Sequence, residues 1–217
     1  MNATYTLYGA PGSGAVAVEA ALTLLGRPYE VVESAPFDNP ADAEALAAIN
    51  PMRQVPALAL PSGELMTESA AILTWLADAH PAARLAPALE APTRPAFLRW
   101  MAYVSAQIYA LYWIRDDLSR LGADKAHEAV IDARTAERIA HCWGQMEAQV
   151  TPGAWLLGED LSILDVYVTV VSRWTPRRRR FYEVAPRMGE VVRRLDADPR
   201  LADLWARRYP FEAGWEG

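Results

Sequence analysis

Residues 50–56 read Asn-Pro-Met-Arg-Gln-Val-Pro, and Glu68-Ser69 opens the apolar stretch that follows. Proline has no N–H and the Val55–Pro56 bond can be cis, so the chain turns away from an ordinary strand ladder and leaves a main-chain edge open. Glu68 and Ser69 stand where a helix begins, and the unpaired N–H groups and the dipole of a helix start attract a carboxylate. The Glu68 carboxylate suits an ammonium group. These two segments predict a surface that grips a peptide by its backbone and by its free amino-acid end.

The elements around this stretch alternate between strand and helix. Short β-prone runs and apolar runs of helical spacing follow one another, with glycine and proline at the boundaries. The order β-α-β-α-β-β-α predicts a mixed four-stranded sheet with helices on both faces. The predicted strands are 5–8, 29–33, 55–60 and 64–67, and the predicted helices are 14–25, 41–49 and 68–80.

The rest of the chain has helical spacing almost throughout. A stretch rich in proline and alanine precedes it. Ser162-x-x-Asp165 is a capping box in front of an apolar helix. We predict a first domain over residues 1–81, a linker over 82–95 and an all-helical domain over 96–217. The predicted helices of this domain are 93–120, 124–150, 162–175, 186–197 and 200–208.

Composition excludes several classes of protein. The chain is 52% hydrophobic and carries a net charge of −6, which argues against a nucleic-acid binder. Its single cysteine, Cys142, allows no intrachain disulfide, as is usual in a reducing compartment. The N-terminal residues lack the pattern of a secretory signal, and no uncharged apolar run is long enough to span a membrane. We therefore expect a cytoplasmic protein without a membrane partner.

Three motifs together resemble the glutathione transferase family. They are Asn-Pro-x-x-Gln-Val-Pro-Ala-Leu over 50–58, Thr-Glu-Ser-x-Ala-Ile over 67–72 and Leu-Ser-x-x-Asp over 161–165. The resemblance covers essentially the whole chain. It implies a thioredoxin-like first domain, an all-helical second domain and a homodimer. The implied activity is conjugation of the thiol of glutathione, as co-substrate, to a small hydrophobic electrophile.

The resemblance also assigns the glutathione contacts residue by residue. The backbone of Val55 pairs with the cysteinyl part of glutathione, with Pro56 in the cis form. Glu68 holds the γ-glutamyl amino group and Ser69 holds its carboxylate. Arg53 stands where some classes contact the glycyl carboxylate, and a guanidinium suits that bidentate contact.

The group that activates the thiol is expected between the first strand and the first helix. Pro-Gly-Ser over 11–13 resembles the serine-dependent classes, so Ser13 is the first choice and Tyr8 the alternative. A hydroxyl donor beside a helix start stabilises the thiolate, which is the reactive form. Ser13 is also a preferred N-cap residue, and capping is the structural alternative. Gly14 stands where the cysteine-dependent class has its cysteine, which disfavours mixed-disulfide chemistry.

The electrophile is expected between the two domains. Residues 100–113 are rich in aromatic side chains, and Tyr109 aligns with a pocket-facing histidine of the bacterial class. The three histidines lack metal-ligand spacing, so no metal is expected. Gly9, Gly12 and Gly14 imitate a dinucleotide fingerprint, but their spacing is wrong for it.

Several alternatives remain open at this stage. The same thiolate could serve a peroxidase or an isomerase, since a fold does not fix a function. The fold could also serve as a non-catalytic interaction platform. The four consecutive arginines over 177–180 are expected to be a solvated helix end or loop.

Overall fold

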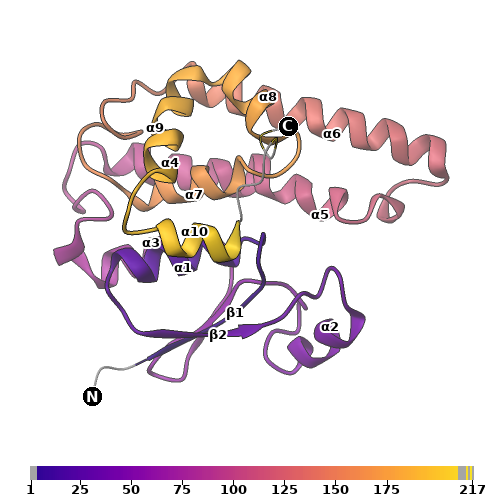
Figure 1. Cartoon of the computed structure of the whole chain (residues 1–217), viewed down its shortest axis with the longest axis horizontal. Helices are drawn as coiled ribbons and strands as arrows, with labels where there is room; N and C mark the ends of the chain where they lie inside the picture. Colours follow the sequence, from indigo (N-terminus) through magenta and orange to yellow (C-terminus); the bar gives the residue numbers. More distant parts are fainter. Residues whose placement is uncertain (1–3, 210–213, 215, 217) are drawn as a thin grey trace.

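The computed structural model describes residues 4–209, 214 and 216 of the 217-residue chain. Figure 1 shows a sheet half, drawn in indigo and violet, below a larger helical half. In the part of the chain described, no helix combines the length and apolar character needed to cross a bilayer.

The sheet has four strands in the order β2-β1-β3-β4. β1 (Tyr5–Gly9) runs parallel to β2 (Tyr29–Glu33), and β3 (Ala57–Ala59) runs antiparallel to β1. The short edge strand β4 (Leu65–Met66) is antiparallel to β3. All four predicted strands are present, and β3 and β4 are shorter than predicted because Val55 and Pro56 lie outside the ladder.

Helices cover both faces of this sheet. α1 (Ala15–Leu24) and α3 (Ser69–Ala79) lie between the sheet and the helical half, and α2 (Pro40–Ala47) lies beside the strands, away from α1 and α3 (Figure 1). α1 is alanine- and valine-rich all round and buried from Ala15 to Leu22, as expected of a helix packed on two sides. The predicted thioredoxin-like sheet with helices on both faces is confirmed.

The helical half begins inside the predicted linker, because α4 starts at Arg94 with Pro95 in its first turn. The division into two domains stays a prediction, and the buried apolar residues of both halves form one continuous cluster.

The elements that follow α3 in the chain are η1 (Pro81–Ala83), α4 (Arg94–Tyr103), η2 (Val104–Ile108), η3 (Tyr109–Leu111), α5 (Tyr112–Arg115), η4 (Leu118–Arg120), α6 (Lys125–Glu147), α7 (Ile163–Val171), α8 (Arg177–Val184), α9 (Pro186–Asp196) and α10 (Ala202–Arg208).

The single helix predicted over 93–120 is wrong. The chain passes from α-helix into the π-turn η2 and then into the 3₁₀-turn η3, which begins at Tyr109. π-turns inside helices are frequently found at functional sites. Here the π-turn lies directly before Tyr109, one of the predicted site residues.

The arginine run forms the first turn of α8, and three of its four residues are exposed, as expected of a solvated helix end. Arg178 is fully buried in α8, where it donates to Asp196 at 2.8 Å and to the Thr169 carbonyl at 2.8 Å. The prediction fails for Arg178 because the partly buried carboxylate of Asp196 in α9 compensates its charge.

The predicted capping box at the start of α7 is present. The Asp165 carboxylate accepts from the Ser162 N–H at 2.8 Å and from the Leu156 N–H at 2.8 Å. Burial raises the pKa of Asp165 to about 6, against the lowering effect of these hydrogen bonds. This anchor fixes α7, which packs against α1 and carries a tyrosine of the candidate site.

Candidate functional site

The register of the sheet gathers the predicted site residues at one edge. Tyr8 pairs with Ala57, so the end of β1 lies beside the start of β3. Leu58 pairs with Met66, so β4 also leaves the sheet at this edge. α1 follows β1 and α3 follows β4, and the N-termini of both helices therefore open at the same place. Two helix starts at one edge make a region favourable to anions.

The segment before β3 presents its main chain at this edge. The Val55–Pro56 bond is cis, as the resemblance implied. Within the described residues, the N–H and C=O of Val55 make no hydrogen bond. The buried side chain of Asn50 shapes the loop, donating to the Gln54 carbonyl at 2.9 Å and accepting from the Met52 N–H at 3.1 Å. A ligand backbone can therefore pair with Val55.

Glu68 and Ser69 face different surroundings at the start of α3. The Glu68 side chain is exposed, and its residue has a positive φ of 65°. The first bond within the helix runs from the Ile72 N–H to the Glu68 carbonyl, so the amides of the first turn remain open to an acceptor. Ser69 is buried, with its hydroxyl 2.8 Å from the Tyr167 hydroxyl.

Sequence reasoning missed Tyr167, which lies in α7 of the helical half. It is fully buried and stacks on Tyr109 with ring centroids 6.2 Å apart. Burial raises its pKa to about 12, so the hydroxyl stays protonated and can donate. A tyrosine in an otherwise apolar buried helix needs a hydrogen-bond partner, and that need was the available signal.

Arg53 lies apart from the other predicted residues. Its exposed guanidinium forms an ion pair with Glu44 of α2 at 2.7 Å. The residue has a positive φ of 55°, which turns the chain toward Val55. Exposed pairs of this kind contribute little to stability, so the guanidinium can exchange Glu44 for another carboxylate.

Ser13 is buried in the loop that joins β1 to α1, defined here as Ala10–Gly14 and called the β1–α1 loop. Its hydroxyl donates to the Ala10 carbonyl at 2.7 Å and accepts from the Ala10 N–H at 3.3 Å. It also accepts from the Ala15 N–H at 3.2 Å, within the first turn of α1. The Ser13 side chain therefore closes the loop and satisfies a helix-start amide. Tyr8 is partly exposed and points opposite to the buried Tyr5 and Leu7.

Tyr109 reaches across from the helical half to the start of α1. A β-carbon placed on Gly14 would lie 2.2 Å from the Tyr109 hydroxyl oxygen, so that hydroxyl fills the space over the loop. Burial raises the pKa of Tyr109, and the charge of Glu68 acts in the same direction. The structure therefore brings Tyr109 against Gly14, next to Ser13 in the chain.

Comparison with known proteins agrees with this geometry. The sequence profile described as "Glutathione S-transferase, N-terminal domain" matches residues 7–88. An "Uncharacterized GST-like protein YncG" of Escherichia coli (strain K12) is 30% identical over 202 residues, which cover 93% of this chain and 97% of that relative.

The chain belongs to the glutathione S-transferase family.

Other family members agree in sequence or fold. "Glutathione S-transferase GstA" of Escherichia coli O157:H7 is 24% identical over 156 residues, covering 72% of this chain and 74% of that one. A glutathione transferase homolog from sulfitobacter, solved with bound glutathione, is 28% identical with a TM-score of 0.80, covering 94% of this chain and 98% of that one. A sphingomonad glutathione S-transferase complexed with glutathione shares the fold at 24% identity, with a TM-score of 0.76 and the same two coverages.

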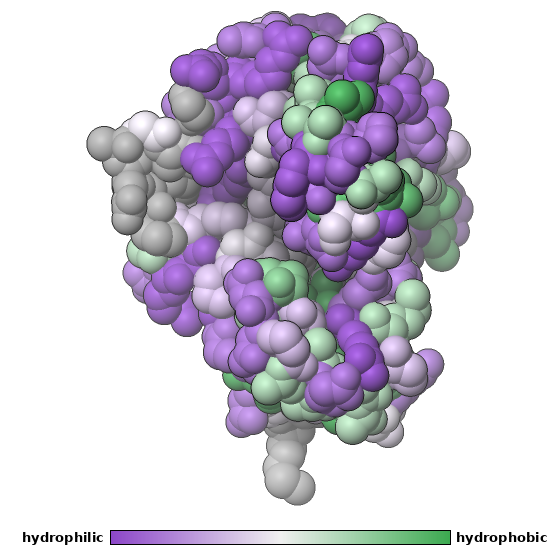
Figure 2. Space-filling view, turned by 90° about the vertical axis from the view of Figure 1, so that its right-hand side faces the viewer, coloured by the Kyte–Doolittle hydropathy of each residue, from purple (hydrophilic) through white to green (hydrophobic). Residues whose placement is uncertain are grey.

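The surface of this glutathione S-transferase family member is indented between its two halves. Figure 2 shows the hollow on the side where α5 and α2 face each other, with hydrophobic residues at its floor. The pKa of Asp116, just after α5, is raised mainly by burial and also by Asp38, which follows β2. The two carboxylates are therefore near enough for their charges to interact.

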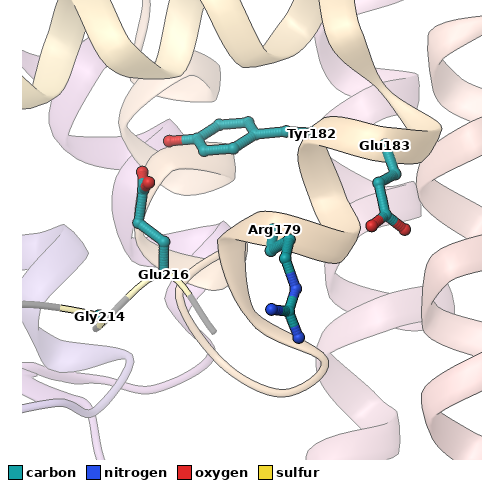
Figure 3. Close-up of a pocket in the computed structure, with 5 residues that line it drawn as sticks. All are labelled: Arg179, Tyr182, Glu183, Gly214 and Glu216. Carbon is teal, nitrogen blue, oxygen red and sulfur yellow. The ribbon is translucent and has the colours of Figure 1, made fainter.

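Two cavities lie elsewhere in the glutathione S-transferase fold. One, of about 610 Å³, is lined by residues within 77–93 and 157–162. The other, of about 500 Å³, is lined by Arg179, Tyr182, Glu183, Gly214 and Glu216. In Figure 3 the Glu216 carboxylate points toward Tyr182, whereas the Arg179 and Glu183 side chains point away. These polar groups do not converge on a common point, and no predicted site residue lines either cavity.

Proposed function

We propose that this chain binds reduced glutathione and conjugates its thiolate to a small hydrophobic electrophile. The observation that carries the proposal is the shared sheet edge, where the unbonded backbone of Val55 and the open start of α3 meet the β1–α1 loop. This edge offers main-chain pairing for the middle of a peptide and anion-binding amides for its ends. The solved sulfitobacter homolog with bound glutathione supports the same ligand.

In this proposal the two ends of glutathione are bound differently. The exposed Glu68 carboxylate holds the γ-glutamyl ammonium group, and the amides at the start of α3 hold the neighbouring carboxylate. Ser69 assists there together with Tyr167, whose hydroxyl it already contacts. Arg53 turns from Glu44 to the glycyl carboxylate, for which a guanidinium has two parallel donors.

Activation consists of lowering the pKa of the bound thiol. The thiol releases its proton to solvent, and the thiolate forms a carbon–sulfur bond to the electrophile while the leaving group departs with its electron pair. Ser13 is the proposed donor to the thiolate, with Tyr8 as the alternative. The Ser13 hydroxyl has to turn from the neutral Ala10 carbonyl, and an anion is the stronger acceptor of the two.

The electrophile is proposed to lie in the hollow between the halves. Tyr109 borders the sulfur position, and its ring lies edge-on to Trp174 with centroids 5.0 Å apart. Alignment of two bound reactants there supplies the remaining rate enhancement. We also propose a cytoplasmic homodimer with a detoxifying role, on the ground of the family alone.

One experiment separates the proposed transferase from its rivals. Calorimetry measures glutathione binding to the purified chain, and an absorbance assay follows conjugation with an activated aryl halide. We expect saturable binding together with conjugation, both weakened in Glu68→Gln. Leu89→Ala is a matched surface control, because Leu89 is 72% exposed and lies outside the site.

The other outcomes identify the alternatives. Glutathione binding without conjugation, but with turnover of a peroxide or of an isomerisable substrate, assigns the thiolate to that second chemistry. Absence of binding at millimolar glutathione contradicts the proposal and favours an interaction platform. The Tyr109 hydroxyl above Gly14 is the structural feature that favours this last alternative, since it takes up space at the sulfur position.

A further inference from the structure

The Gly12 peptide in the β1–α1 loop is held by the helical half. The Gly12 carbonyl accepts from the Trp174 indole N–H at 2.7 Å and from the Tyr209 hydroxyl at 2.9 Å. The Gly12 N–H donates to the Arg208 carbonyl at 3.2 Å. Gly12 has a φ of +73°, a conformation that only glycine adopts readily. Both polar groups of this loop residue therefore bond to residues of the helical half.

The two donors form one unit. The Trp174 N–H also lies 3.1 Å from the Tyr209 hydroxyl oxygen, so it is shared between that oxygen and the Gly12 carbonyl. Trp174 follows α7 and Tyr209 follows α10. The Tyr209 ring packs on the Arg173 guanidinium, whose carbon lies 4.5 Å from the ring centroid. Burial raises the pKa of Tyr209, which keeps its hydroxyl a donor.

The end of α10 is itself anchored to the sheet half. Arg208 forms an ion pair with Glu19 of α1 at 2.9 Å and another with Glu33 of β2 at 2.6 Å. Glu19 is fully buried and Arg208 is 8% exposed, so this contact is shielded from solvent. These ion pairs of Arg208 therefore hold the neighbouring Tyr209 in a fixed position beside Gly12.

We propose that Trp174 and Tyr209 are positioning residues for thiol activation, an inference that rests on the proposed glutathione transferase function. Their hydrogen bonds draw the Gly12 carbonyl toward the helical half. The negative end of that peptide dipole then points away from the sulfur, where a carbonyl oxygen would repel a thiolate. The same hydrogen bonds hold the Gly12–Ser13 peptide in one orientation. They thereby fix the position of the Ser13 hydroxyl.

Trp174 also connects this unit with the electrophile side. Its ring lies edge-on to Tyr109 at 5.0 Å and to Tyr112 at 4.9 Å between centroids. An electrophile that displaces Tyr109 therefore alters the packing of Trp174, which is hydrogen-bonded to the β1–α1 loop. The substitution Trp174→Phe keeps part of this packing and removes the N–H, and Tyr209→Phe removes only a hydroxyl.

The test uses three variants: Trp174→Phe, Tyr209→Phe and the double variant that combines them. Each is compared with the control variant Tyr5→Phe. Tyr5 is the matched control, because its hydroxyl bonds to His80 at 3.0 Å at the opposite end of β1. The measurements are amide hydrogen exchange over residues 9–16, the pH dependence of thiolate absorbance of bound glutathione, and kcat and KM for aryl-halide conjugation.

We expect Tyr209→Phe to speed exchange over the loop and to lower kcat about tenfold, with KM for glutathione nearly unchanged. The acid-dissociation constant of the bound thiol falls by a similar factor, about tenfold. The double variant loses less than the product of the two single effects, because both donors serve one carbonyl.

Two results overturn the proposal. The first is that amide exchange, thiol ionisation and kcat in the Trp174 and Tyr209 variants match those of Tyr5→Phe. The other is faster exchange with unchanged thiol ionisation and kcat, because the hydrogen bonds are then structural only. The wild-type chain tests the proposed function and the variants test the positioning residues, so the two failures are distinguishable.

Discussion

The two helix starts at the shared sheet edge are built in different ways. At the start of α3, Glu68 is exposed and the first-turn amides are open, and both features come from one short stretch of sequence. At the start of α1, the Gly12 peptide bonds to residues 162 and 197 positions away in the chain. In the proposed glutathione site, the amino-acid end is therefore encoded locally, whereas the proposed sulfur end depends on tertiary contacts.

The largest expected effect tests the sulfur end directly. Ser13→Ala removes the proposed donor to the thiolate, and the loss of one such donor typically lowers kcat by about 100-fold or more. Steady-state kinetics and the ionisation of the bound thiol measure it. Tyr8→Phe is the control and should have little effect. A larger loss in Tyr8→Phe than in Ser13→Ala transfers the activating role to Tyr8.

The second effect belongs to the amino-acid end. Glu68→Gln removes the charge that faces the γ-glutamyl ammonium, and a hydrogen bond to a charged group is worth about 1.5–3 kcal/mol. The dissociation constant for glutathione should rise about tenfold to a hundredfold, with kcat nearly unchanged, because this contact exists equally in the ground and transition states. Calorimetry and kinetics measure the two quantities. If kcat falls by the same factor as the affinity for glutathione, Glu68 also acts in the transition state. The proposed difference between the amino-acid end and the sulfur end of the site is then contradicted.

A third prediction concerns the close packing over the β1–α1 loop. Gly14→Ala places a β-carbon against the Tyr109 hydroxyl and should lower the free energy of unfolding by about 1–3 kcal/mol. Gly144→Ala is the matched control, because a β-carbon there has its nearest neighbour at 3.7 Å and gains helix propensity of about 1 kcal/mol. Urea unfolding measures both. Equal stability of the two variants contradicts the packing seen at Gly14.

The smallest effect concerns the anchor of α10 and its dependence on pH. Burial raises the pKa of Glu19 despite the opposing effect of Arg208. The folded state then holds this proton to higher pH than the unfolded state does, so the contribution of Glu19 to stability is lost as pH rises through the folded-state pKa. As pH rises through the mildly acidic range, the free energy of unfolding of Glu19→Gln should decline less steeply than that of the wild-type chain. An unchanged pH profile means that Glu19 is not the group responsible.

Local patterns predicted the sheet half well. Strand alternation, glycine and proline boundaries and the apolar helix faces gave its element order, and Glu68 and Ser69 stand at the start of α3 as expected. The reason is physical, since each of these features acts over a few residues. The capping box at Ser162 was predicted for the same reason.

Features that depend on distant partners could not be predicted in this way. Four arginines in sequence favour a solvated segment, and only the fold supplies Asp196 to bury Arg178. The π-turn before Tyr109 has no sequence pattern that distinguishes it from continuous helix. Trp174 and Tyr209 resemble ordinary core aromatics until the fold places them on the Gly12 carbonyl. The roles proposed for Ser13, Val55, Glu68 and Ser69 remain predictions.

The Tyr109 hydroxyl above Gly14 also constrains the evolutionary routes open to this chain. A cysteine at position 14 would place its β-carbon against that hydroxyl, so it costs less stability once residue 109 has become smaller. Substitutions at positions 14 and 109 should therefore be coupled in their effect on stability.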